Sequence, residues 1–234
     1  MLKNSCRVGA ITFLLIAVCF GGTAQAAMLD PAEIDASRFL PPPPAADTAR
    51  AKAEIAELHA IAAASTDALL EAVRRDDADE KPDLFNAALG FDVTKLPATS
   101  KMLNDILKEE ETGSKAAKAY FHRDRPWIVD ASIKTCVPEK PGPAANSYPS
   151  GHASVAFSLG VVLAELMPEK AQAILARSSE FAEHRLACGV HFRSDIVAGQ
   201  QFGTVLALRL MEKPAFKAEM DAARAELRTA HYTN

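Results

Sequence analysis

Residues 149–167 read PSGHASVAFSLGVVLAELM, and this stretch decides the fold. From Ala153 to Met167 it is almost wholly apolar, which is typical of a helix buried on every side. Ser150 stands just before it and is a natural helix N-cap. The run falls short of the roughly 18 to 20 uninterrupted apolar residues that a bilayer demands. It therefore predicts a buried central helix and no membrane span.

The rest of the chain supplies partners for this helix. Glu169–Ala187 is amphipathic, and Ile196–Met211 is apolar with a few polar residues interspersed. Further helices are predicted at 47–64, at 67–75 after the cap Ser65-Thr66-Asp67, and at 82–88, 100–111 and 114–122. Strand signals are scarce, so the fold class is all-α. With 234 residues, 49% of them hydrophobic, the chain predicts one compact helical domain around the central helix.

Two proline-rich segments separate these helices. Leu29–Ala45 is irregular, and its Pro41–Pro44 run predicts an extended polyproline arm that packs on the domain. Val129–Tyr148 contains three prolines of its own and predicts a long loop.

The N-terminus carries the pattern of a secretory signal peptide. Lys3 and Arg7 precede the apolar run Val8–Phe20, and the small-residue triplet Ala24-Gln25-Ala26 follows. This predicts export with cleavage near Ala26, leaving 27–234 as a single mature domain. A membrane anchor is the alternative, although the apolar run is short for a span.

Export changes the meaning of the cysteines and of the charge. Two of the four cysteines leave with the signal peptide, and Cys136 and Cys188 remain. In an oxidising compartment such a pair suggests one disulfide, and two buried free thiols are the alternative. No Cys/His cluster has the spacing of a zinc site. The net charge of -4 falls to -6 without Lys3 and Arg7, so nucleic-acid binding is not expected.

Three short motifs carry candidate chemistry. Lys118 and Arg125 lie seven apart, which on one helix places both side chains on the same face to grip an anion. A solvated basic face is the alternative. At the start of the apolar helix, Gly151 lets the backbone approach a ligand. The backbone N–H groups of the first helical turn favour an anion beside His152. A histidine in such a turn is often only structural.

The third motif holds a candidate nucleophile. Cys188-Gly189 is expected to end the preceding helix with Arg185 in its last turn, and a new helix begins close to His191. Asp195 is placed to accept the N–H of one ring nitrogen of His191, which leaves the other unprotonated for attack. His–Asp pairs at this spacing also arise often by chance.

Taken together, Lys-x6-Arg-Pro, Pro-Ser-Gly-His and Arg-x5-His-x3-Asp resemble the signature of the type 2 phosphatidic acid phosphatase superfamily. The proline run after Leu40, the lead-in Asn146-Ser147-Tyr148 and Cys188-Gly189-Val190-His191 look more closely like the bacterial class A non-specific acid phosphatases. The resemblance implies an all-helical periplasmic enzyme that hydrolyses many small phosphomonoesters. It also implies no metal or other cofactor, and a homo-oligomer.

The resemblance also implies a role for each motif residue. His191 would attack phosphorus and form a phosphohistidine, with Asp195 orienting it. His152 would protonate the leaving alcohol and later activate water. The phosphate oxygens would be held by a further set of residues, namely Lys118, Arg125, Ser150, Gly151 and Arg185.

The chain departs from the family pattern at two positions. His184 stands where the family has serine, and Asn146 where it often has glycine. A histidine can still donate a hydrogen bond, so His184 joins the candidate phosphate-binding residues. Arg123, His122 and His231 match no motif position and are expected at the surface.

Three other functions fit parts of the pattern. Vanadium haloperoxidases have a similar anion site, but are usually much longer chains. A periplasmic lipid-phosphate phosphatase would use the same residues, although such relatives generally carry several membrane spans. A phosphate-binding protein without turnover would not need His191, Asp195 and His152 together.

Overall fold

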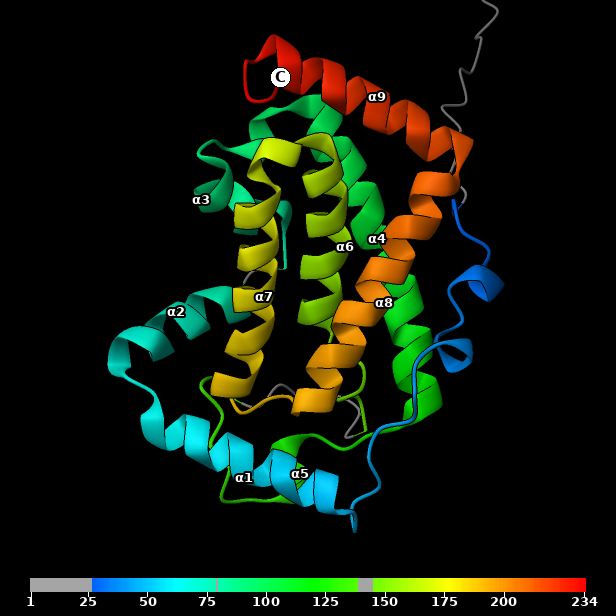
Figure 1. The fold of residues 1–234 in the computed structure, drawn as a ribbon. Coiled ribbons are helices and arrows are strands. Elements are labelled where there is room, and N and C mark those ends of the chain that lie inside the picture. Colours follow the sequence, from blue (N-terminus) through cyan, green and yellow to red (C-terminus); the bar gives the residue numbers. More distant parts are fainter. Residues whose placement is uncertain (1–26, 79, 139–144) are drawn as a thin grey trace, which may run out of the picture.

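The computed structural model describes residues 27–78, 80–138 and 145–234. Within these ranges the chain is helical and has no strand, which confirms the all-α class (Figure 1). The signal peptide predicted for residues 1–26 lies outside the described residues.

Long helices and short 3-10 turns alternate along the chain. The α-helices are α1 Ala49–Ala64, α2 Asp67–Asp77, α3 Asn86–Leu89, α4 Pro97–Phe121, α5 Pro126–Val129, α6 Gly151–Leu166, α7 Ala171–Ala187, α8 Arg193–Glu212 and α9 Pro214–Thr229. The 3-10 turns are η1 Pro31–Glu33, η2 Ala36–Arg38, η3 Pro82–Phe85, η4 Val93–Lys95 and η5 Pro168–Lys170.

Helix α6 is the buried centre that its sequence predicts. Helices α4, α7 and α8 pack around it (Figure 1), and Leu159, Val162 and Leu163 have no exposed surface. The Ser150 hydroxyl caps its first turn by accepting the N–H of Ala153. In the described part of the chain no helix is both long and apolar enough to cross a membrane.

Two glycines bring α8 against the first turns of α6. A Cβ on Gly199 would lie 2.4 Å from the carbonyl oxygen of Ser150, and one on Gly203 would lie 2.3 Å from that of Ser154. No side chain fits at these positions, so the two backbones touch. The Ser150 N–H in turn donates to the carbonyl of Asp195 at 3.0 Å. This contact fixes the N-termini of α6 and α8 side by side.

The structure corrects the prediction for residues 100–122. The two helices predicted at 100–111 and 114–122 are one, α4, which runs through Gly113 without a break. A Cβ on Gly113 would lie 2.6 Å from the Phe202 ring, so close packing against α8 accounts for this glycine. The helix ends at Phe121, because His122 adopts a left-handed conformation with φ 48°.

Two further differences concern neighbouring segments. Lys118 and Arg125 are not on one helix as predicted, since Arg125 lies beyond His122, at the position just before α5. Helix α9 was not predicted from the sequence, and it packs against α4. The prediction of an N-terminal arm is confirmed at Pro41, whose carbonyl accepts the Tyr148 hydroxyl at 2.6 Å.

Candidate active site

Three segments meet at one end of the central helix. Figure 1 shows the N-terminus of α6 at the same end of the domain as the turn between α7 and α8. The segment from the end of α4 to α5 joins them, because Arg125 reaches the Val190 carbonyl at 2.7 Å and Lys118 reaches the Pro149 carbonyl at 2.8 Å. All three sequence motifs are therefore brought together.

The His191 ring lies between the carboxylate of Asp195 and the guanidinium of Arg125. Its Nδ1 lies 3.3 Å from Asp195 Oδ2, and its Nε2 lies 2.8 Å from Arg125 Nη1. A guanidinium can only donate, so Nε2 accepts and the ring proton is on Nδ1, facing Asp195. Burial, and then the charges of Arg125 and Lys118, lower the pKa of His191 well below its usual 6.5. The imidazole is therefore neutral, with the lone pair on Nε2.

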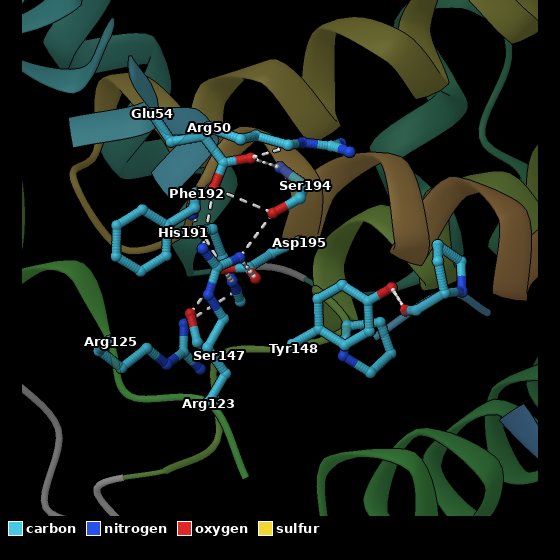
Figure 2. Close-up of polar contacts among 12 residues, drawn as sticks. Arg50, Glu54, Arg123, Arg125, Ser147, Tyr148, His191, Phe192, Ser194 and Asp195 are labelled. Atoms are coloured by element: carbon cyan, nitrogen blue, oxygen red, sulfur yellow. Dashed lines mark hydrogen bonds and ion pairs between the residues drawn. The ribbon is translucent and has the colours of Figure 1, made fainter. Parts of the chain in front are cut away.

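Asp195 is completely buried and is surrounded by donors (Figure 2). Its Oδ1 accepts from Arg123 Nη1 at 2.6 Å, and its Oδ2 accepts from the Ser147 hydroxyl at 2.6 Å and the Phe192 N–H at 2.8 Å. Burial raises the pKa of Asp195, while the Arg123 charge and these hydrogen bonds oppose that change. The donors fix the carboxylate in the orientation that His191 requires.

Arg123 was expected at the surface, and that prediction is wrong. Its side chain is only 9% exposed, and it bridges Asp195 to Glu54 of α1, whose Oε2 accepts from Nη2 at 2.8 Å. Its guanidinium also lies over the Phe192 ring at 4.1 Å (Figure 2). No motif marks Arg123, and only its place two residues before Arg125 could have drawn attention to it. His122 and His231 are exposed, as predicted.

Lys118 and Arg125 share a partner, although they come from different elements. Lys118 Nζ donates to the Asn146 carbonyl at 3.0 Å, and Arg125 Nε donates to the Asn146 side-chain oxygen at 2.8 Å. Asn146 thus ties the two cations to the loop before α6. Burial and the nearby Arg125 charge lower the pKa of Lys118 to about 8.

The salt bridge of Arg185 leaves part of its guanidinium without a hydrogen-bond acceptor among the described residues. It is 4% exposed, and its Nη2 pairs with Asp77 Oδ1 of α2 at 2.7 Å. Its Nε and Nη1 are buried and have no hydrogen-bond partner among the described residues. Leaving buried donors of a charged group unpaired costs free energy, which an anion placed against them would recover. We call Lys118, Arg125 and Arg185 the cation cluster.

His152 faces a carboxylate that the sequence did not indicate. Its Nδ1 lies 2.5 Å from Glu80 Oε1, and its Nε2 makes a long hydrogen bond of 3.5 Å with the Asp77 carbonyl. The ring stacks on Phe181 with centroids 5.5 Å apart. Burial and the Arg185 charge lower the pKa of His152, and Glu80 acts in the opposite direction.

His184 is engaged by α2. Its Nδ1 lies 2.6 Å from Asp76 Oδ2, and Asp76 also pairs with Arg177. The ring is buried against these partners, and its predicted bond to phosphate stays a prediction.

Cys136 and Cys188 form the disulfide that their number suggested. It ties the loop after α5 to the residue that caps the end of α7. The Cys136 N–H also donates to the Cys188 carbonyl at 2.9 Å, and Val73 and Val190 pack beside the pair. The disulfide therefore anchors the turn between Arg185 and His191. In the ranges that the structure describes, no group of three or more His, Cys, Asp or Glu side chains is placed to hold a metal ion.

Replacing Arg123 with methionine should destabilise the protein strongly. The substitution leaves the carboxylates of Asp195 and Glu54 buried without their cation, which typically costs about 3 to 5 kcal/mol. Arg50→Met is the matched control, because Arg50 also pairs with Glu54 but is 68% exposed, and such pairs contribute about 0 to 1 kcal/mol. Urea unfolding measures both, and equal midpoints for the two variants would contradict the assignment of Arg123.

Comparison with known proteins identifies the family of the chain. The PAP2 superfamily matches residues 98–217, about half of the chain, and all three motifs lie within that range. The non-specific acid phosphatase of Salmonella typhi is 36% identical over 149 residues, which cover 62% of this chain and 59% of that protein. The acid phosphatase of Zymomonas mobilis is 32% identical over 145 residues, which cover 62% of this chain and 55% of that protein. The chain thus matches less than two thirds of the length of these relatives.

A solved structure shares the fold. It is the first transmembrane PAP2 type phosphatidylglycerolphosphate phosphatase from Bacillus subtilis, with a TM-score of 0.51 and 18% sequence identity. The match covers 76% of this chain and 92% of that one. Sequence and fold agree, and the chain belongs to the PAP2 superfamily.

Proposed function

We propose that this protein is an exported acid phosphatase that hydrolyses small phosphomonoesters through a phosphohistidine intermediate. The observation that carries the proposal is the pair of unpartnered, buried donors on Arg185, beside a neutral His191. A phosphoryl group is an anion that such donors can hold while a neutral imidazole attacks it. The relatives named acid phosphatases support the same reaction.

The cation cluster would hold the phosphate oxygens, together with Ser150 and the Gly151 N–H at the start of α6. Arg125 would transfer its Nη1 hydrogen bond from His191 Nε2 to a phosphate oxygen, which frees the lone pair for attack. Charge accumulates on the equatorial oxygens during transfer, and fixed donors stabilise it there.

In the first step, His191 Nε2 would form a bond to phosphorus as the bond to the leaving alcohol breaks. The leaving oxygen would take the proton from Nδ1 of His152, because Nε2 of that ring faces the Asp77 carbonyl, which can only accept. Asp195 would stabilise the positive charge that develops on the His191 ring.

In the second step, water would attack phosphorus on the opposite side from His191 while Nδ1 of His152 takes its proton. The bond between phosphorus and Nε2 would break, and the lone pair would return to His191. No metal or cofactor enters either step. The periplasmic location, the homo-oligomer and the phosphate bond from His184 belong to the same proposal.

A substrate panel in the presence of EDTA tests the proposal. We expect hydrolysis of many phosphomonoesters, little of diesters, and no loss of rate on chelation. Activity confined to lipid phosphates would favour a lipid-phosphate phosphatase, and bromination with added vanadate and peroxide would favour a haloperoxidase. Activity that EDTA abolishes and zinc or magnesium restores would refute the metal-independent mechanism.

The two histidines should fail differently when each is replaced with alanine. His191→Ala removes the nucleophile and should abolish both turnover and phosphoenzyme. His152→Ala removes proton transfer, which is worth roughly 10²- to 10⁴-fold, yet p-nitrophenyl phosphate needs little help to leave. This variant should therefore accumulate an acid-labile, base-stable phosphoenzyme, detected by rapid quench with labelled substrate. A phosphorylated residue other than His191 would show that the nucleophile is wrongly assigned.

The rate should be highest at acidic pH. His191 must be neutral to attack, and its pKa lies well below 6.5, so the rate rises with pH in the range well below 6.5. His152 must be protonated, and its pKa is also lowered, so the rate falls again as pH passes that value. The optimum of kcat/KM should therefore lie below about 6.5, the ordinary pKa of histidine. A pH profile with its maximum above about 8 would contradict the role given to His152.

A further inference from the structure

Glu80 is a partly exposed acidic residue in contact with the candidate site. It follows α2 and is 48% exposed, yet its Oε1 lies 2.5 Å from Nδ1 of the buried His152. A Cβ built on Gly151 would lie 3.7 Å from the same oxygen. The carboxylate therefore lies against the two residues that begin α6.

Cations from several helices act on this carboxylate. Burial raises its pKa, but the hydrogen bond and charge of His152, and then the charges of Arg185 and Lys118, lower it to about 2. The charge of Glu80 in turn acts to raise the pKa of Arg125, the third member of the cation cluster. A carboxylate that experiences the whole cluster lies where the electrostatic field favours an oxyanion.

The contact also uses the nitrogen that the reaction needs. Nε2 of His152 faces a backbone carbonyl, so Nδ1 is the nitrogen left to exchange a proton with a leaving group. Glu80 Oε1 faces that same Nδ1. A leaving oxygen and the Glu80 carboxylate cannot both accept its proton.

We propose that the Glu80 carboxylate competes with the substrate for the contact with His152. A phosphate ester displaces the carboxylate from His152 when it binds. This role rests on the proposed function for the step it precedes, but the competition itself requires only anion binding. It predicts that Glu80 weakens binding of small anions, including the product phosphate. Glu80 thereby favours release of product over tight binding.

The test compares binding of inorganic phosphate by calorimetry at pH 5.5. Glu80→Gln keeps the shape of the side chain and removes its charge, so the affinity for phosphate should rise by about 1.5-fold to fivefold, the range expected for losing one half-exposed ion pair. Glu80→Asp keeps the charge but shortens the side chain that reaches His152. Its affinity for phosphate should lie between those of the wild type and Glu80→Gln.

Glu71→Gln is the matched control. Glu71 lies on α2, is 73% exposed and pairs with Arg75, so this variant removes the same charge away from the site. It should bind phosphate as the wild type does. An increase equal to that of Glu80→Gln would show that only net charge matters, and would overturn the proposal.

Steady-state kinetics separate competition from a positioning role. Competition predicts a lower KM for p-nitrophenyl phosphate and a lower inhibition constant for phosphate in Glu80→Gln. A fall in kcat with no change in KM, or equal phosphate affinity in both proteins, would overturn the proposal. If the wild type binds phosphate but hydrolyses no phosphomonoester, the proposed function fails, and the binding comparison still decides the role of Glu80.

Discussion

The buried carboxylate of Asp195 is the constraint on which the site depends. A charge with no exposed surface is costly unless donors surround it, and those donors come from segments far apart in the chain. Arg123 joins Asp195 to the end of α4 and, through Glu54, to α1, while Ser147 joins it to the loop before α6. The close contact of α8 with α6 at Gly199 supplies the remaining restraint. Satisfying one carboxylate therefore fixes the elements that carry His191, His152, Lys118 and Arg125.

The charged groups of the site are held in place by other groups of the protein. Lys118, Arg125 and Arg185 are held by backbone carbonyls, by Asn146 and by Asp77. Their mutual repulsion is tolerated because these partners are fixed, and the same positive field lowers the pKa of His191. In the proposed mechanism a neutral imidazole among cations is suited to attack an anion, because the anion takes over the hydrogen bond that Arg125 donates to Nε2 and the lone pair is then released. The cost of orienting these groups is met during folding, which is the basis of electrostatic preorganisation.

Much of the fold was predictable, because its signals are local. The apolar run of α6, the cap at Ser150 and the helix end before Gly189 each depend on neighbouring residues, and each is present. Predictions failed where distant packing prevails over local preference. Gly113 does not end a helix because Phe202 packs against it, and the spacing of Lys118 and Arg125 misled because His122 turns the chain between them. Arg123, Glu80 and Glu54 were missed, since partners 69 to 72 residues apart leave no periodic trace.

Arg185 shows how such a site can be both stable and incomplete. Its pairing with Asp77 satisfies one end of the guanidinium and orients the plane, while Nε and Nη1 stay without partners. A second fixed carboxylate at those atoms would stabilise the fold further, but it would fill the place that we propose for the phosphate group of the substrate. The molecule instead positions Glu80 at the edge, where it is half exposed and attached to a short segment after α2. An anion at the edge can leave, whereas one as deeply buried as Asp195 cannot, and this difference in burial separates the structural carboxylate from the displaceable one.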